Sequence, residues 1–518
     1  MFFSVSVLKK NIAANFAGSI WQVLVSLVCI PLYIKFMGIE SYGLIGIFAT
    51  LQATFIILDM GVSATLNREM ARLSALQGRE QEMRNLVRSL EVICWSIAIL
   101  IGIAVVAMAP FSAQYWVKAE QLSPQTIEEA VLIMGFVMAL QWPAAFYSGG
   151  LRGLQKQVLL NVIIISMSTL SGVGAVLILW LISPTIKAFL SWQIIISGLN
   201  TCLLAWFLWH RLPHAGKTPT LEKKLLDGVW RFAAGMFGIG ILATILTQLD
   251  KIILSKMLTL EMFGYYALAG VVSMSLIYLI NPVFAAIFPR LTQLVTRGDH
   301  DGLKQLYHNS CQLMSVLILP ATVVIAMFSY DILLIWTQNP VTAEKTHLLV
   351  SILVCGTALN GLMHIPYGLQ LANGWTKLTL YSNLIAVIIM VPMIVYLTGQ
   401  YGALGGASVW VIINSGYFLI VIPIMHRRLL ISEKWRWYWQ DVGLPFVASL
   451  ITAGLGRLFL VGQASQVATA FYLIIVSIPT LLITAMVTPT TRAWFFDALL
   501  KIKMEYKDQN RHDNNGNL

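Results

Sequence analysis

The chain is a succession of apolar segments, each about 20 to 28 residues long, separated by short polar stretches, and a helix needs about 20 apolar residues to cross a bilayer. The segments lack the alternation of β-barrel strands. Only 11% of the residues are charged, against roughly 25% in soluble proteins. Because so few charges cannot cover a soluble surface, the sequence predicts an all-α integral membrane protein and excludes soluble enzymes and nucleic-acid-binding proteins.

We predict fourteen membrane-spanning helices from these segments. They lie at residues of roughly 11–35, 41–66, 88–110, 125–150, 157–182, 185–209, 229–256, 261–288, 307–336, 345–371, 378–398, 402–426, 440–461 and 466–488. With this count, 27 of the 34 Lys and Arg residues fall on one side of the membrane and five on the other. Cytoplasmic loops carry the excess of Lys and Arg, so we expect both termini in the cytoplasm.

A sequence repeat with an offset of 221 residues relates the two halves of the chain. Residues 35–43 resemble residues 256–264, and residues 153–156 resemble residues 374–377. Six spans separate the copies, and an even number keeps the orientation, so the repeat is parallel. We therefore expect two parallel six-helix lobes, spans 1–6 and 7–12, around a central cavity, a known design of secondary transporters. Spans 13 and 14 are then two additional C-terminal helices.

The same reasoning divides the chain into five parts. They are an N-terminal six-helix lobe (1–210), a cytoplasmic linker loop (211–228), a C-terminal six-helix lobe (229–427), two additional transmembrane helices (428–490) and a polar cytoplasmic tail (491–518). Within the first lobe, we interpret residues 67–88 as an amphipathic helix at the membrane surface.

No cofactor or metal is expected from the sequence. The five cysteines lie in apolar runs, and no Cys/His cluster has metal-ligand spacing. A phosphate-binding G-x-x-x-x-G-K-[ST] loop is also absent. Energy for transport would therefore come from a proton or sodium gradient, from the membrane potential or from consumption of the product.

Several short motifs resemble those of the polysaccharide-unit flippases of the O-antigen (Wzx) type, which belong to the multidrug/oligosaccharidyl-lipid/polysaccharide exporter superfamily. The motifs are Glu40-Ser-Tyr-Gly43 with its copy at residues 261–264, Asp59-Met-Gly61, Asn67-Arg-Glu69, Gly149–Lys156 and Gln248-Leu-Asp-Lys251. The resemblance covers about residues 5–490. It implies translocation of an undecaprenyl-diphosphate-linked oligosaccharide, an O-antigen or related unit, from the cytoplasmic to the periplasmic leaflet of the bacterial inner membrane by alternating access. Membrane lipid, a polysaccharide polymerase and chain-length proteins are the further partners that it implies.

Charged residues within spans are costly and usually face a cavity, which makes Asp250 and Lys251 candidate substrate-binding residues. Gln248 lies three residues before Lys251 and shares its helix face. Two interpretations are open for this group: a polar patch in the cavity, or a structural ion pair between helices. Asp59, in span two, is either an ion site or a structural partner of Arg68.

Three arginines end spans at the predicted cytoplasmic surface, namely Arg68, Arg152 and Arg290. One interpretation is a cationic vestibule that collects the diphosphate, since Arg binds phosphate through two parallel hydrogen bonds. The other is ordinary anchoring by the positive-inside rule. His364 in span ten is expected to be a hydrogen-bonded packing residue rather than a proton relay. Span residues such as Asn360 and Asn383 serve either sugar hydroxyls or interhelical hydrogen bonds.

Two other functions remain open. A multidrug or cation antiporter of the same superfamily would usually have twelve spans and strongly acidic lobes. A membrane polymerase or ligase of polysaccharide assembly would carry a large outer loop with Arg, His or acidic residues. The longest outer loop, about residues 111–124, has no such cluster, so we expect a transporter without enzymatic activity.

Overall fold

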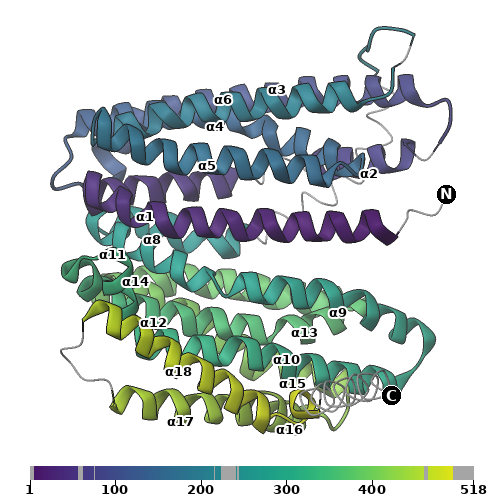
Figure 1. Cartoon of the computed structure of the whole chain (residues 1–518), viewed down its shortest axis with the longest axis vertical. Coiled ribbons are helices and arrows are strands. Elements are labelled where there is room, and N and C mark those ends of the chain that lie inside the picture. Colours follow the sequence, from purple (N-terminus) through teal and green to yellow (C-terminus); the bar gives the residue numbers. More distant parts are fainter. Residues whose placement is uncertain are drawn as a thin grey trace, which may run out of the picture. The chain divides into compact units, whose positions relative to one another are not determined.

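A computed structural model describes residues 5–55, 62–74, 76–214, 216–222, 241, 244–459 and 465–493 (Figure 1). Over these residues the protein is all-helical, as the apolar pattern predicts, and eleven helices are long and apolar enough to cross a membrane. Two of the eleven bend at a glycine in the left-handed region, Gly38 (φ 80°) and Gly402 (φ 58°). Their arms overlap predicted spans one and two, and eleven and twelve, although the described part of the second arm ends at Phe55, before the predicted end of span two at residue 66. Half of span seven falls outside the described residues, so the count of fourteen stays a prediction.

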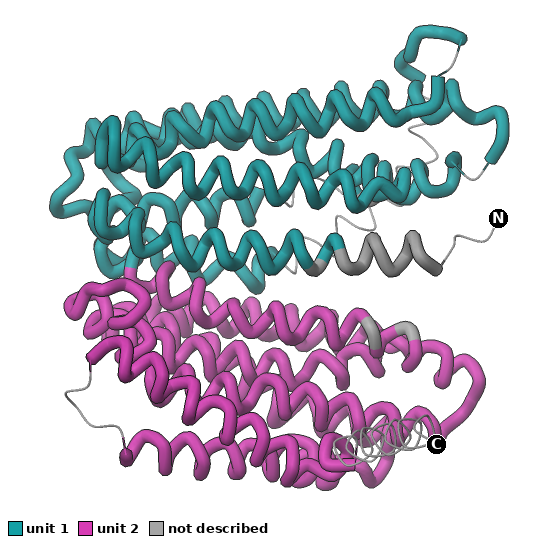
Figure 2. The backbone as a smooth tube through the Cα atoms, in the orientation of Figure 1, with its two compact units in different colours: residues 1–264 teal, residues 265–518 magenta. Residues whose placement is uncertain are grey.

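The chain forms two compact units, residues 1–264 and 265–518 (Figure 2). The helices of the first unit are α1 (Val5–Phe55), α2 (Val62–Leu73), α3 (Glu80–Phe111) with a π-helical turn (Ser112–Trp116), α4 (Pro124–Gly153), α5 (Gln157–Leu181), α6 (Ile186–Arg211) and a helical stretch at residues 244–257. Helix α8 (Leu260–Met274) crosses from the first unit into the second. The predicted lobe boundaries stay predictions.

The first unit is built around α4, which packs against α2, α3 and α6. Their apolar faces meet in one core that includes the fully buried Leu66, Met70, Phe146 and Leu151. Burying such side chains stabilises the fold by roughly 1.5–3 kcal/mol each. Helix α1 packs on α5, where Gly172 leaves room for the side chain of Val25.

The second unit contains the remaining helices. They are α9 (Ile277–Arg297), α10 (His300–Met327), α11 (Ser329–Thr337), α12 (Pro340–Leu362), α13 (His364–Ala372), α14 (Thr376–Gly416), a π-helical turn (Tyr417–Val421), α15 (Ile422–Arg428), α16 (Lys434–Arg436), a second π-helical turn (Trp437–Gly443), α17 (Leu444–Leu458) and α18 (Gln466–Val487). Its core joins α9, α10, α12 and α13. Helices α17 and α18 form a hairpin that packs on α10 (Figure 1).

Short polar side chains begin five of these helices. The oxygens of Ser123, Thr185, Asp299, Asn339 and Ser465 each accept a hydrogen bond from the backbone N–H three residues later. Such N-caps satisfy a helix donor that has no partner within the helix. Ser123 and Asn339 are followed by proline, which suits the first helical position because it lacks an N–H.

Residues 67–88 do not form one amphipathic helix, so that prediction is wrong. Helix α2 ends at Leu73, and α3 begins at Glu80. Between them Gly78 has a φ of 76°, a left-handed conformation that interrupts a helix and that glycine adopts at little cost. The charges have helical spacing on both sides of the break, but this spacing gives no sign of the turn at Gly78, where the chain passes from α2 to α3.

Glu40 of the repeated motif has a structural role at the loop between α3 and α4. Its buried carboxylate accepts hydrogen bonds from the backbone N–H groups of Glu120 (2.6 Å) and Gln121 (2.9 Å). The backbone oxygen of Lys118 in the same loop accepts a 2.7 Å hydrogen bond from the N–H of Leu260. The loop is thus tied to both copies of the motif.

The two motif copies also contact each other reciprocally. A Cβ on Gly43 would lie 2.3 Å from the backbone oxygen of Leu260, and a Cβ on Gly264 would lie 2.5 Å from that of Ile39. Both pairs obey the offset of 221, so this first sequence match has a local twofold counterpart in the structure. Only glycine allows the backbones to approach so closely.

The second sequence match is shifted in the structure. Gln155 and Gly374 both have left-handed backbone conformations, with φ of 58° and 68°. Gln155 lies in the turn after α4, and Gly374 lies in the turn after α13. The three hydrogen bonds of the turn at Gly150–Lys156 recur at Leu369–Trp375. These equivalent turns are 219 residues apart, so pairing Gly153 with Gly374 is two residues out of structural register.

A buried ionic cluster attaches the α17–α18 hairpin to α10. His308 is fully buried, and its Nδ1 lies 2.5 Å from Oδ2 of Asp441 while its Nε2 lies 2.9 Å from Oε2 of Glu433. Gln312 donates to the second oxygen of Asp441 (2.9 Å), and Lys304 pairs with Glu433. At the other end of the hairpin, Arg457 pairs with Asp331 at 2.5 Å.

Candidate functional site

Two of the predicted arginines lie at one end of the first unit. Arg68 is on α2, and Arg152 is in the last turn of α4. Their neighbours touch, since a Cβ on Gly153 would lie 2.4 Å from the backbone oxygen of Asn67. Both arginines are exposed, and Arg68 lies 4.0 Å from Glu69. The close approach of Asn67 and Gly153 thus brings the helix segments that carry the two arginines together.

The polar group of predicted span seven lies in the helical stretch at residues 244–257. Lys251 is half-buried, and its Nζ donates to the backbone oxygen of Thr247 (3.1 Å) and to Oε1 of Gln248 (3.4 Å). Gln248 and Lys251 thus share a helix face, as the spacing predicts. Asp250 is half-buried as well. The group can offer a positive charge and an amide to a ligand.

The other predicted residues are not in these groups. Arg290 is on α9 in the second unit, where it is exposed and donates to Oε1 of Gln293 (3.1 Å). Asp59 lies outside the described residues. Among the residues that the structure describes, no cluster of His, Cys, Asp or Glu has the geometry of a metal site.

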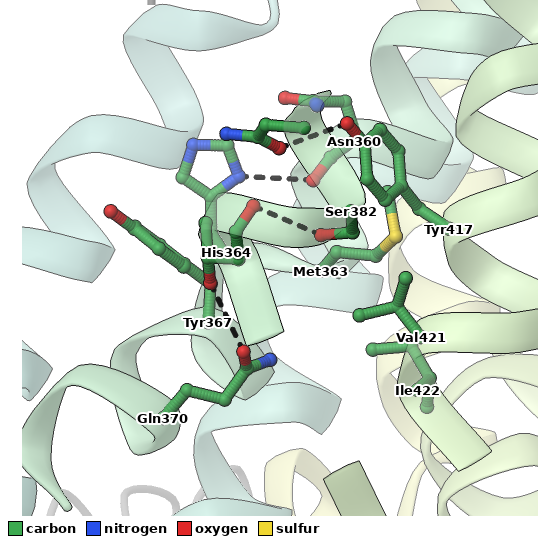
Figure 3. Close-up of a pocket in the computed structure, with 11 residues that line it drawn as sticks. Asn360, Met363, His364, Tyr367, Gln370, Ser382, Tyr417, Val421 and Ile422 are labelled. Atoms are coloured by element: carbon green, nitrogen blue, oxygen red, sulfur yellow. Dashed lines mark hydrogen bonds between the residues drawn. The ribbon is translucent and has the colours of Figure 1, made fainter. Parts of the chain in front are cut away.

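The second unit contains a pocket of about 260 Å³ that sequence reasoning did not predict as a unit (Figure 3). It is formed by the end of α12, by α13, by the start of α14 and by the π-helical turn before α15. Its lining residues are Asn360, Met363, His364, Tyr367, Gln370, Thr379, Ser382, Asn383, Tyr417, Val421 and Ile422. This set contains polar, aromatic and apolar side chains but no Asp, Glu, Lys or Arg.

Hydrogen bonds fix the orientation of several polar groups in the pocket (Figure 3). Nδ1 of His364 lies 3.0 Å from the backbone oxygen of Asn360, so Nδ1 carries the proton and Nε2 of the neutral ring is an acceptor. Oε1 of Gln370 accepts from Thr379 (3.1 Å), and Oδ1 of Asn383 accepts from the hydroxyl of Tyr417 (2.9 Å). The amide nitrogens of Gln370 and Asn383 have no hydrogen-bond partner among the described residues.

An aromatic group supports one side of the pocket. The ring of Phe284 on α9 stacks on Tyr367, with centroids 6.3 Å apart and planes at 15°. The ring of His364 meets Phe284 edge-on at 5.9 Å. Packing against Phe284 therefore holds two pocket residues in fixed orientations.

Sequence reasoning found this region only in part. It singled out Asn360, His364 and Asn383 as isolated polar span residues. His364 is indeed hydrogen-bonded and packed, but it also borders the pocket. Gln370 and Tyr417 were missed, because they come from helices far apart in sequence and carry no local motif.

Comparisons with known proteins give the following relatives. A family model described as polysaccharide biosynthesis protein matches residues 8–295, and a model described as MatE matches residues 236–396. A putative O-antigen transporter from Shigella flexneri is 21% identical over 405 residues, which are 77% of this chain and 93% of the relative. The shared segment thus covers most of both proteins.

Two kinds of solved structure resemble the fold. A lipid II flippase, MurJ, in an inward closed conformation matches with a TM-score of 0.67 and 15% identity, over 95% of this chain and 99% of the flippase. An inward-facing multidrug resistance transporter of the MATE family matches with a TM-score of 0.67 and 14% identity, over 80% of this chain and 96% of the transporter. At these identities the likeness concerns the fold alone.

Proposed function

Because the chain belongs to the polysaccharide biosynthesis protein family, we propose that it is a flippase for an undecaprenyl-diphosphate-linked oligosaccharide. The cargo is an O-antigen unit or a unit of a related surface polysaccharide. The protein carries it from the cytoplasmic to the periplasmic leaflet of the bacterial inner membrane by alternating access. Both termini are cytoplasmic in this proposal, and the protein makes or breaks no covalent bond.

The main support for a flippase is the share of this chain that the match to the lipid II flippase covers. The match to the lipid II flippase leaves out only 5% of this chain, which is fewer residues than α17 and α18 contain together. The match therefore includes at least part of this hairpin. The matches to multidrug transporters reach only 80–83% of the chain. The flippase is thus the better structural analogue of the whole chain.

The cationic residues supply the chemistry that a diphosphate requires. We assign Arg68, Arg152, Arg290 and Lys251 to recognition of the diphosphate, with Gln248 and Asp250 next to Lys251 as further substrate contacts. Asp59 is proposed with them from the sequence alone. A charge-assisted hydrogen bond to phosphate contributes about 1.5–3 kcal/mol, so losing one contact should weaken binding by about one to two orders of magnitude.

A multidrug or cation antiporter is the second candidate. The match of residues 236–396 to the MatE model and the equal TM-score of the multidrug transporter favour it. The hairpin that extends the match to the flippase favours the first candidate. In either case we expect a proton or sodium gradient, the membrane potential or product consumption to drive transport.

A flipping assay in proteoliposomes separates these candidates. The probe is a fluorescent undecaprenyl-diphosphate oligosaccharide whose label is quenched only in the outer leaflet. We expect the full-length protein to equilibrate the probe between leaflets, and a deletion strain to accumulate lipid-linked oligosaccharide in the inner leaflet. Absence of both effects, together with export of a cationic dye in the same vesicles, would replace the flippase by the antiporter. A pulldown of the polymerase and chain-length proteins tests the partners.

Alanine variants test the assignment of the cations. Arg152→Ala, Arg290→Ala and Lys251→Ala should each slow flipping about tenfold or more while the protein still inserts. Arg152→Lys should restore activity only in part, because lysine keeps the charge but lacks the forked guanidinium. Lys217→Ala, in an exposed loop, is the matched control. If all three alanine variants flip like the parent at equal membrane levels, positive-inside anchoring explains these residues.

A further inference from the structure

We propose that the pocket between α12, α13, α14 and the π-helical turn at Tyr417 is a glycan subsite that takes one uncharged sugar ring. The inference rests on the proposed function, because it assigns to this pocket one sugar of the lipid-linked oligosaccharide. The sugar would contact the side chains of Gln370, Asn383, His364 and Tyr417, and the ring of Tyr367 would form an apolar wall.

The free hydrogen-bonding groups of the pocket match hydroxyl groups. Oε1 of Gln370 and Oδ1 of Asn383 already accept hydrogen bonds within the unit, so each amide has its NH₂ donors left for a ligand. His364 presents Nε2 as an acceptor because its Nδ1 is engaged by Asn360. Separate donors and acceptors around one space suit a ligand whose groups both donate and accept, and a hydroxyl does both.

The amide of Gln370 is a free donor on a nearly buried residue. Gln370 is only 3% exposed, and side-chain polar groups at such burial are normally hydrogen-bonded. Its amide nitrogen has no partner among the residues that the structure describes and stays accessible from the pocket. A polar ligand in the pocket would complete the hydrogen bonds of this amide, whereas an apolar ligand would leave them unmade and lose binding free energy.

The absence of charged lining residues selects an uncharged ligand. None of the eleven lining residues is Asp, Glu, Lys or Arg. A carboxylate or phosphate would lose water on entry without gaining an oppositely charged partner, which is unfavourable. The uncharged pocket thus differs from the positively charged region at Arg68 and Arg152. In this proposal the pocket binds a sugar of the substrate, and the arginines bind its diphosphate.

The size and walls of the pocket favour a single ring. Its volume of about 260 Å³ is below the roughly 300–1,000 Å³ of sites for drug-sized ligands, and an oligosaccharide is larger than such ligands. Tyr367, held by stacking on Phe284, offers an aromatic face to the C–H face of a sugar. Met363 and Ile422 add apolar surface, so few polar groups set the orientation of the ring, as in typical ligand sites.

Binding of small glycosides to the full-length protein in nanodiscs tests this inference. The probes are the methyl glycosides of a neutral hexose, an N-acetylhexosamine and a hexuronic acid, followed by saturation-transfer NMR. We expect at least one neutral glycoside to bind and the hexuronic acid not to bind. Gln370→Leu and Asn383→Leu should each weaken that binding about tenfold or more, since each leaves a sugar hydroxyl without its donor.

Asn373→Leu is the matched control, because Asn373 follows α13 outside the pocket and its amide donates to the backbone oxygen of Leu369. It should bind the glycoside like the parent. Gln370→Glu nearly preserves the shape of the side chain but adds a charge, so it should also lose binding. This second variant keeps the test valid if Gln370→Leu fails to fold. Equal binding by parent and pocket variants, or preference for the uronic acid, would overturn the subsite.

The flipping assay distinguishes failure of the subsite from failure of the proposed function. If the parent flips the lipid-linked probe and the pocket variants flip and bind like the parent, the subsite is wrong and the function stands. If the parent does not flip the probe but binds a neutral glycoside through Gln370, the function is wrong and the pocket remains a sugar site.

Discussion

Replacing His308 by alanine should loosen the α17–α18 hairpin from α10. The imidazole is fully buried, and each of its nitrogens faces a carboxylate oxygen, at 2.5 Å for Asp441 and 2.9 Å for Glu433. Without the ring, Glu433 keeps Lys304, but Asp441 keeps only the neutral amide of Gln312 at one oxygen. The uncompensated charge of Asp441 therefore dominates the loss.

Breaking a buried ion pair by removing one partner costs about 3–5 kcal/mol. At 1.4 kcal/mol for each factor of ten, this change should raise the open fraction of the hairpin by about two to three and a half orders of magnitude. Replacing both His308 and Asp441 by leucine should recover most of the loss, because an apolar pair of similar volume often replaces a buried ion pair at little cost.

Alkylation of Cys311 provides a local measure of this opening. Cys311 is 3% exposed and lies one turn after His308 on α10, within the same core. In a background without the other four cysteines, its labelling rate should rise with the open fraction in His308→Ala and fall back in the double leucine variant. Labelling of His308→Ala at the parent rate would refute the reasoning, because the cluster would then not hold the hairpin.

Glu433, which lies between α15 and α16, gives the cluster a dependence on pH. Burial raises the pKa of Glu433, but the hydrogen bond from Lys304 and the charge and hydrogen bond of His308 outweigh burial and hold the pKa below its usual value of 4.5. A carboxylate with a lowered pKa stabilises the folded state above its unfolded pKa, and this stabilisation is lost as the pH falls through the folded pKa. The contribution of Glu433 to the cluster should therefore be constant near neutrality and be lost in acid.

Three further outcomes are expected. Labelling of Cys311, measured relative to a free thiol at the same pH because only the thiolate reacts, should rise as the pH falls below about 4.5, where Glu433 takes up its proton; an unchanged relative rate there would contradict this. Gly264→Val should abolish accumulation of the folded protein on a fluorescence size-exclusion column, because its Cβ would press on a backbone oxygen 2.5 Å away, whereas a normal profile would show that the contact can relax. A reporter fused at Lys217 should be active only in the cytoplasm and one at Ala343 only in the periplasm, and reversal of either would remove the predicted topology.

The regular features of the fold follow from local sequence, and so could be predicted. A run of 20 apolar residues determines a span by itself, which is why the gaps between predicted spans at residues 36–40 and 399–401 fall at or beside the bends at Gly38 and Gly402. The reciprocal contact of Gly43 and Gly264 also has a visible signal in the repeated motif. Charge spacing alone was a weaker guide, as the turn at Gly78 shows.

The pocket and the ionic cluster have partners far apart in the chain, so no local pattern encodes them. His308 contacts Glu433 and Asp441 over separations of 125 and 133 residues. One signal was available: Asp441 lies within a predicted span, and the high cost of charge in a membrane should have singled it out together with Asp250. No comparable rule selects Gln370, because neutral polar residues in spans are common and most serve interhelical hydrogen bonds.

Segments outside the helices return to α10 in the second unit, and a similar contact occurs on α3 in the first unit. This likeness supports a duplication that included these connecting segments as well as the helices. Left-handed glycines, Gly78 and Gly298, precede α3 and α10 with an offset of 220. In the first unit, Glu222 follows α6 and returns to α3, where its backbone N–H donates to Ser89 (3.0 Å).

In the second unit, Glu433 follows α15 and returns to His308 on α10. Thr490 then donates to Asn309, the counterpart of Ser89 at the same offset of 220. In each unit, a segment that follows one of the helices therefore returns to neighbouring positions of the equivalent helix, α3 in the first unit and α10 in the second. A shared docking face, kept through different side chains, is expected if the ancestral unit already held its C-terminal end in this way. The hairpin α17–α18 would then have been added at a point that the fold had already fixed.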